Sequence, residues 1–172
     1  SFVMHDLAFT RLNAIRHAIA NAFDRPGLSP HLGTLSHVAL RFAPGYRVSA
    51  LYLAAWIAMR LGGTVDRSQS RANHFVISST GSKGGPSTFL IEVGEIEEGR
   101  EGTIEVDFQL AEAKVEISRC QTRDFLRTLV HRSDRSSDED WLPSRNHSDA
   151  ALVADILNRA GRNRTYSQVL PL

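Results

Sequence analysis

Residues 102–119 read GTIEVDFQLAEAKVEISR, two runs in which apolar and charged side chains alternate on either side of a short turn. Alternation with a period of two is typical of strands that bury one face, so we expect strands at residues 102–110 and 113–119. Parallel neighbours need a crossover of a dozen or more residues, so this short turn predicts an antiparallel pair. The side chains expected to face solvent are Glu105, Asp107, Lys114 and Glu116.

Further strands and several helices are expected on both sides of this hairpin. Strand-like runs cover residues 35–42, 72–79 and 88–96. Apolar positions at helical spacing predict a helix over residues 6–24, and shorter patterns of the same kind indicate helices over residues 121–131 and 148–159. Between the last two, residues 132–140 are charged and rich in serine, and we interpret them as a linker.

The most apolar element of the chain is residues 48–63, which read VSALYLAAWIAMRLGG and end on paired glycines. A helix that is apolar on almost every side is normally buried, so Trp56 is expected in the core. The order of elements predicts one α+β domain over residues 1–172. Its expected architecture is an antiparallel sheet of about five strands with helices packed mainly on one face.

Composition excludes several classes of protein. The 172 residues contain 20 Lys and Arg against 19 Asp and Glu, a net charge of +1, which lacks the excess typical of nucleic-acid binding. A single cysteine allows no intramolecular disulfide, and no run of about 18 apolar residues suggests a membrane span. No signal peptide is visible near Ser1, so a cytoplasmic location is expected.

Two segments have the composition of a catalytic or phosphate-binding site. Residues 80–88, TGSKGGPST, lack the spacing of a nucleotide-binding loop and lie between two strands, so we interpret them as a hairpin loop. A dense group of acids could supply a hydrolase carboxylate pair, but its alternation with apolar residues indicates the solvated side of a sheet. These acids are Glu92, Glu95, Glu97, Glu98, Glu101, Glu105 and Asp107.

The sequence also contains no pattern typical of a metal site or of a catalytic nucleophile. An acidic group near the linker lacks the glycine-centred spacing of a calcium loop and is expected to be solvated. It consists of His131, Asp134, Asp138, Glu139 and Asp140. Cys120 follows a strand without any nucleophile signature, so a half-buried thiol is expected. No catalytic residue, metal site or cofactor is therefore predicted.

Trp141 is harder to assign than Trp56. It follows an acidic run and precedes Pro143, where a large aromatic side chain is either an interface anchor or part of a small satellite cluster.

Three segments in order resemble the OpcA family of glucose-6-phosphate dehydrogenase assembly proteins. They are residues 6–24 (DLAFTRLNAIRHAIANAFD), 50–63 (ALYLAAWIAMRLGG) and 152–170 (LVADILNRAGRNRTYSQVL). The matching positions are expected to be mostly structural and include Asp6, Arg11, Arg16, Trp56, Arg60, Gly161 and Tyr166. The resemblance covers the family's carboxy-terminal domain.

The resemblance implies a cytoplasmic, non-catalytic protein that binds glucose-6-phosphate dehydrogenase and supports its oligomerisation or activity. It does not locate the contact surface, for which we select the polar strand face with Glu105, Asp107, Lys114 and Glu116, and secondly Trp141. The alternative is a small regulatory domain that binds a sugar phosphate through arginines and residues 80–88. A hydrolase would need a pocket that gathers a carboxylate pair, or Cys120 with a histidine.

Overall fold

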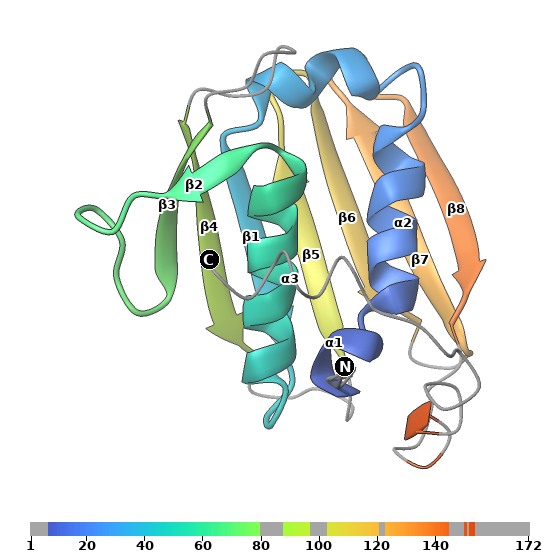
Figure 1. Ribbon diagram of the computed structural model, residues 1–172. Coiled ribbons are helices and arrows are strands. Elements are labelled where there is room, and N and C mark those ends of the chain that lie inside the picture. The colour runs from blue at the N-terminus through green and yellow to red at the C-terminus, as the bar shows by residue number, and fades with distance from the viewer. Residues whose placement is uncertain are drawn as a thin grey trace, which may run out of the picture.

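A large sheet organises the computed structural model, which describes residues 7–79, 88–96, 103–120, 123–144, 150, 152 and 153. Within these residues eight strands pair in the order β2-β3-β4-β1-β5-β6-β7-β8 (Figure 1). Their bounds are β1 His37–Phe42, β2 Gly63–Val65, β3 His74–Ser79, β4 Thr88–Glu95, β5 Ile104–Gln109, β6 Ala113–Arg119, β7 Phe125–Arg132 and β8 Ser137–Pro143.

The central strand β1 makes the sheet mixed. It pairs in parallel with β4, Val38 opposite Ile91, and antiparallel with β5, Val38 opposite Phe108. The remaining neighbours are antiparallel. A helix and two strands separate β1 from β4 in the chain, which gives the long crossover that parallel pairing requires.

The predicted fold class, a five-stranded antiparallel sheet with helices mainly on one face, is therefore wrong: the described residues alone form a mixed sheet of eight strands. The five predicted strands are confirmed as β1, β3, β4, β5 and β6. The helix predicted over residues 121–131 is β7 instead, because Leu126, Thr128 and Val130 are buried in strict alternation. The supposed linker holds β8, whose exposed charges are those of an edge strand.

The helices whose bounds fall within the described residues are α1 Leu7–Thr10, α2 Asn13–Phe23, the 3₁₀ helix η1 Ser29–Thr34 and α3 Arg47–Arg60. The helix predicted over residues 6–24 is thus two helices, because the Leu12 amide donates to the Phe9 carbonyl in a tight turn. After α3 the chain turns at Gly62, whose φ of +66° suits glycine.

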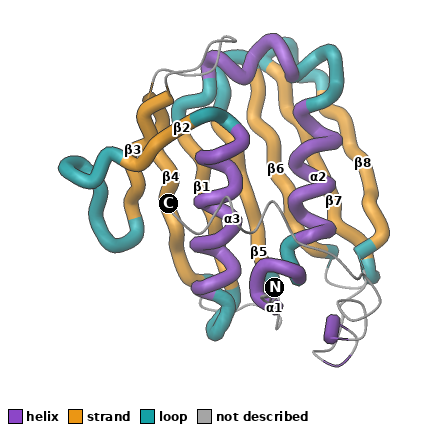
Figure 2. The backbone as a smooth tube through the Cα atoms, in the orientation of Figure 1, coloured by secondary structure: helices purple, strands orange, loops and turns teal. Residues whose placement is uncertain are grey.

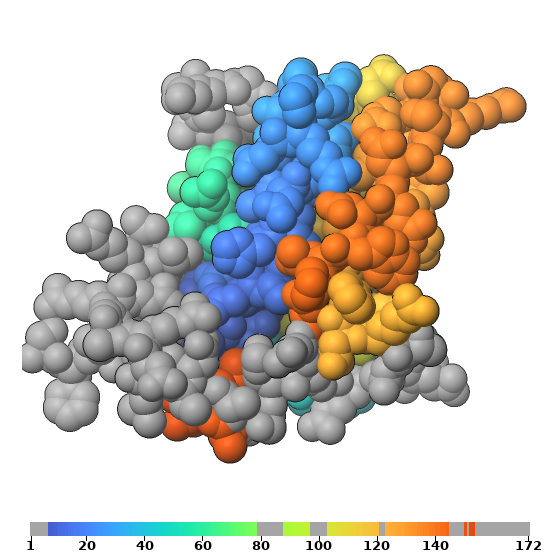
Figure 3. All heavy atoms as spheres, turned by 90° about the vertical axis from the view of Figure 1, so that its right-hand side faces the viewer, coloured from blue at the N-terminus to red at the C-terminus, as the bar shows by residue number. Residues whose placement is uncertain are grey.

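The two longer helices lie next to each other against the sheet (Figure 2). α2 contacts β6, β7 and β8, whereas α3 contacts β1, β2 and β4. Figure 3, which views the β8 edge, shows the blue α2 beside the orange β8. The two helices therefore divide the sheet between them.

The hydrophobic core lies between these helices and the sheet. Fully buried side chains there include Leu53 of α3, Val38 of β1 and Ile91 of β4, and the rings of Phe23 and Phe108 meet edge to face with centroids 4.9 Å apart. Trp56 is 8% exposed, which confirms its predicted place in the core. No helix in the described part of the chain is long and apolar enough to cross a membrane.

Some expectations fall outside the described residues. They concern Asp6, the loop at residues 80–87, Gly161, Tyr166 and most of the helix predicted over residues 148–159. Of that helix, Ala150, Leu152 and Val153 are described, and they are helical.

Candidate functional site

The residues predicted to bind a partner all lie on the sheet face that points away from the buried side chains. Cross-strand partners share a face, and Asp107 pairs with Glu116 between β5 and β6. From Glu116 this row continues to Leu129 of β7 and Glu139 of β8. The neighbouring row on the same face runs from Ser118 through Arg127 to Trp141. We call this surface the open face, defined by Arg41, Glu92, Glu105, Asp107, Lys114, Glu116, Arg127, Leu129, His131, Glu139 and Trp141.

Ion pairs between neighbouring strands hold the charges of the open face in place. The Arg41 guanidinium lies 3.2 Å from a Glu105 carboxylate oxygen and 3.0 Å from one of Asp107. Lys114 donates to Glu116, to which His131 comes within 3.9 Å. Each of these carboxylates therefore has a cationic neighbour.

At the β8 end of the open face, Trp141 lies beside a second ion pair. Arg127 Nε is 2.6 Å from a Glu139 oxygen, and its guanidinium carbon lies 5.9 Å from the centre of the Trp141 ring. Trp141 itself is 45% exposed. An indole braced by a guanidinium but open to water is the geometry of an aromatic contact residue.

The electrostatics of the open face favour permanent charges over proton transfer. The hydrogen bond from Lys114 lowers the pKa of Glu116, and the same bond raises the pKa of Lys114. Both groups are therefore charged at neutral pH, whereas a general acid needs a pKa raised towards neutrality.

The structure separates the residues of the other candidate sites. Asp138 pairs with Arg132, Glu139 with Arg127, and Asp140 with Arg25 after α2, so these acids do not converge on a metal. In the ranges the structure covers, no three His, Cys, Asp or Glu side chains form a metal-binding group. Cys120, the residue that follows β6, is half-buried. Glu97, Glu98 and Glu101 lie outside the described residues.

The described family-motif residues, Arg11, Arg16, Trp56 and Arg60, lie elsewhere, around the two longer helices. Arg11 lies over the Tyr46 ring at 5.4 Å, and Arg16 over the Phe9 ring at 4.0 Å. Trp56 and Arg60 of α3 line a hollow between α2 and α3.

Sequence reasoning missed two arginines of the open face. Arg41 could have been found from the alternation of HVALRF in β1, because it follows Leu40 on the opposite face. Arg127 was not recognised as a strand residue of this face, because residues 121–131 were predicted to form a helix.

Among the comparisons with known proteins, a family model covers nearly the whole chain. The model of a family described as the C-terminal domain of the glucose-6-phosphate dehydrogenase subunit matches residues 3–170. An oxidoreductase from Sinorhizobium meliloti is similar at 11% identity and a TM-score of 0.40, covering 95% of this chain and 50% of that one. An oxidoreductase from Bacillus cereus is similar at 7% identity and a TM-score of 0.43, covering 96% of this chain and 65% of that one. This chain thus spans only part of those structures, and the comparison with curated proteins found no match.

Proposed function

Since the chain belongs to the family of C-terminal domains of the glucose-6-phosphate dehydrogenase subunit, we propose that it is a non-catalytic cytoplasmic assembly factor. In this proposal it binds glucose-6-phosphate dehydrogenase and supports the enzyme's oligomerisation or activity. The family match confirms the resemblance carried by residues 6–24, 50–63 and 152–170, and it supports a role associated with the dehydrogenase.

The observation that carries the proposal is the open face. It extends across the sheet from β4 to β8 and combines charges fixed by ion pairs with the exposed ring of Trp141. Among the described elements, the main helix contacts lie on the side of the buried strand residues, as the contacts and alternating burial indicate. A rigid face with fixed charges can orient a protein partner and accelerate its association.

The ionisation of this surface supports a binding role rather than a catalytic one. Within the open face, the hydrogen bond from Lys114 is the main cause that lowers the pKa of Glu116. Carboxylates of this kind attract and orient a partner but are poor proton donors at neutral pH.

The proposal is tested by mixing the purified chain with the glucose-6-phosphate dehydrogenase of the same organism. Analytical ultracentrifugation and the rate of substrate-dependent NADP reduction are measured with and without the chain. We expect a complex and either a larger dehydrogenase oligomer or a faster rate. The proposal would be contradicted if the two proteins did not co-sediment at micromolar concentration and the chain changed neither the oligomer nor the rate of the dehydrogenase.

A further inference from the structure

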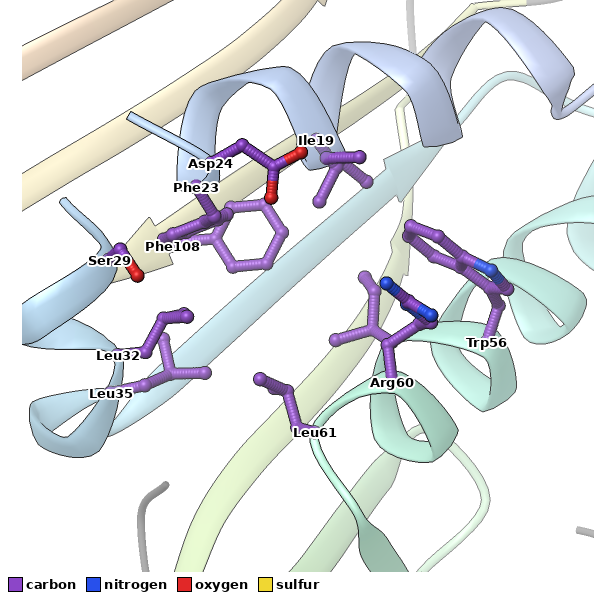
Figure 4. Close-up of a pocket in the computed structure, with 12 residues that line it drawn as sticks. Ile19, Phe23, Asp24, Ser29, Leu32, Leu35, Trp56, Arg60, Leu61 and Phe108 are labelled. Carbon is purple, nitrogen blue, oxygen red and sulfur yellow. The ribbon is translucent and has the colours of Figure 1, made fainter. Parts of the chain in front are cut away.

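A groove runs between α2 and α3, on the opposite side of the sheet from the open face. It consists of two adjoining hollows of about 160 Å³ and about 280 Å³, which share Ala20, Trp56 and Arg60 as lining residues. Figure 4 shows the smaller hollow, with Trp56 and Arg60 of α3 facing Asp24 and Phe23 across it. Ligand pockets are typically about 300–1,000 Å³, so the two hollows together suit a small molecule.

The larger hollow is cationic in the part of the chain that the structure describes. Arg16 and His17 of α2 and Arg60 of α3 line it, and no described Asp or Glu does. Arg16 and Arg60 form no ion pair with any residue that the structure describes. These side chains together resemble the cationic setting that proteins use to hold a phosphate.

The surroundings of Arg16 favour the binding of an anion at this end of the groove. Its guanidinium donates to Asn13 and lies against the Phe9 ring, but no carboxylate of a described residue neutralises it. Burial lowers the pKa of Arg16 to about 10, so the protein environment disfavours its charged form. A bound anion would offset this loss of hydration.

The smaller hollow has a different chemistry, with apolar walls and two polar groups at its rim. Phe23, Leu32 and the Trp56 indole line it, together with the Asp24 carboxylate and the Ser29 hydroxyl. Asp24 is exposed and makes no ion pair with a described residue. Aromatic walls accept the C–H faces of a sugar ring, and a carboxylate with a hydroxyl can bind its hydroxyl groups.

We propose that this groove binds a phosphorylated sugar, with its phosphate held by Arg16, His17 and Arg60 and its ring lying along Trp56 towards Asp24. Arg16 lies in the first turn of α2 and Asp24 directly follows its last residue, eight positions later and roughly 12 Å away at 1.5 Å per residue, which is comparable to the length of a hexose phosphate. The groove is separate from the open face, so the proposed binding of a sugar phosphate does not require the dehydrogenase.

The test measures binding of glucose 6-phosphate, glucose and inorganic phosphate to the chain alone by isothermal titration calorimetry. We expect saturable binding of glucose 6-phosphate, at least about tenfold weaker binding of inorganic phosphate, and weaker binding still of glucose. Equal affinity for glucose 6-phosphate and inorganic phosphate, or no binding of glucose 6-phosphate at millimolar concentration, would overturn the proposal.

Three exposed positions allow variants that leave the fold intact. Arg60→Gln should weaken glucose 6-phosphate and inorganic phosphate alike by about tenfold, whereas Asp24→Asn should weaken only glucose 6-phosphate. Arg67→Gln removes an exposed arginine from the β2–β3 loop and is the matched control, for which wild-type affinity is expected. Equal losses in Arg60→Gln and Arg67→Gln would show a nonspecific charge effect and refute the site.

Discussion

Reversing the two acids of β5 on the open face tests where the dehydrogenase docks. The double variant Glu105→Lys/Asp107→Lys places two cations beside Arg41, which now pairs with both carboxylates. The triple variant adds Arg41→Glu, which restores opposite charges across β1 and β5 while presenting a partner with the inverted pattern. Comparing the two variants separates damage to the fold from damage to recognition.

The effect on stability follows from the exposure of these side chains. Arg41 is 48% exposed, Glu105 32% and Asp107 17%, so each lost pair is close to the surface. Exposed pairs contribute about 0.2–1 kcal/mol each, and the double variant should therefore lose about 0.5–2 kcal/mol. For a chain of this size that is a fall in Tm of about 1–8 °C, which the triple variant should largely recover.

The assay is the association rate of each variant with immobilised glucose-6-phosphate dehydrogenase at low and high salt. Both variants should associate about tenfold more slowly at low ionic strength, and salt should shrink the difference because it screens exposed charges. Glu95→Lys/Asp124→Lys is the matched control, since it reverses two exposed carboxylates outside both the open face and the groove.

Two results would refute the reasoning. Wild-type association by both variants would exclude this part of the open face as the contact surface. Slow association by the double variant alone would assign the effect to lost stability rather than to the charge pattern.

Three further outcomes are expected. Trp56→Ala should lower the free energy of unfolding by about 3–5 kcal/mol in urea denaturation, and a loss below about 1 kcal/mol would contradict its place in the core. Gly63→Val should lower stability by about 1–3 kcal/mol, because an added Cβ would lie 2.3 Å from an Ile77 carbon. An added Cβ at Gly94 meets nothing within 4 Å, so the control Gly94→Ala should melt near the wild type. The hydrogen bond from Lys114 lowers the folded-state pKa of Glu116, so the stability that Glu116 contributes is present above the unfolded-state pKa near 4.5 and is lost as pH falls through the folded-state pKa. Denaturation from pH 6 to pH 3 should therefore show the wild type losing its stability advantage over Glu116→Gln. Parallel stability curves for the two proteins would contradict this expectation.

Local patterns were sufficient for the five predicted strands and for the polar side of β5 and β6. Period-two alternation is a property of each segment, so Glu105 and Lys114 could be placed on one face without knowing the sheet. Whether these residues contact a partner stays a prediction.

The errors arose where distant segments decide the structure. Phe125, Leu126 and Leu129 fit a short helix locally, but pairing with β6 and β8 makes this segment a strand. The parallel pairing of β1 with β4 has no local signal, because it depends on a long crossover. The groove was also missed, since Arg16 and Arg60 lie on separate helices and only packing brings them to one hollow.

The central position of β1 has a consequence for how the chain folds during synthesis. Val38 has its partners in Ile91 and Phe108, so β1 leaves the ribosome well before either neighbouring strand has been made. Until then its apolar side chains and both of its backbone edges stay unpaired, a state that favours aggregation. Such distant pairings also slow folding relative to a sheet built from successive hairpins. Residues 37–42 are therefore the segment that we expect molecular chaperones to shield in the nascent chain.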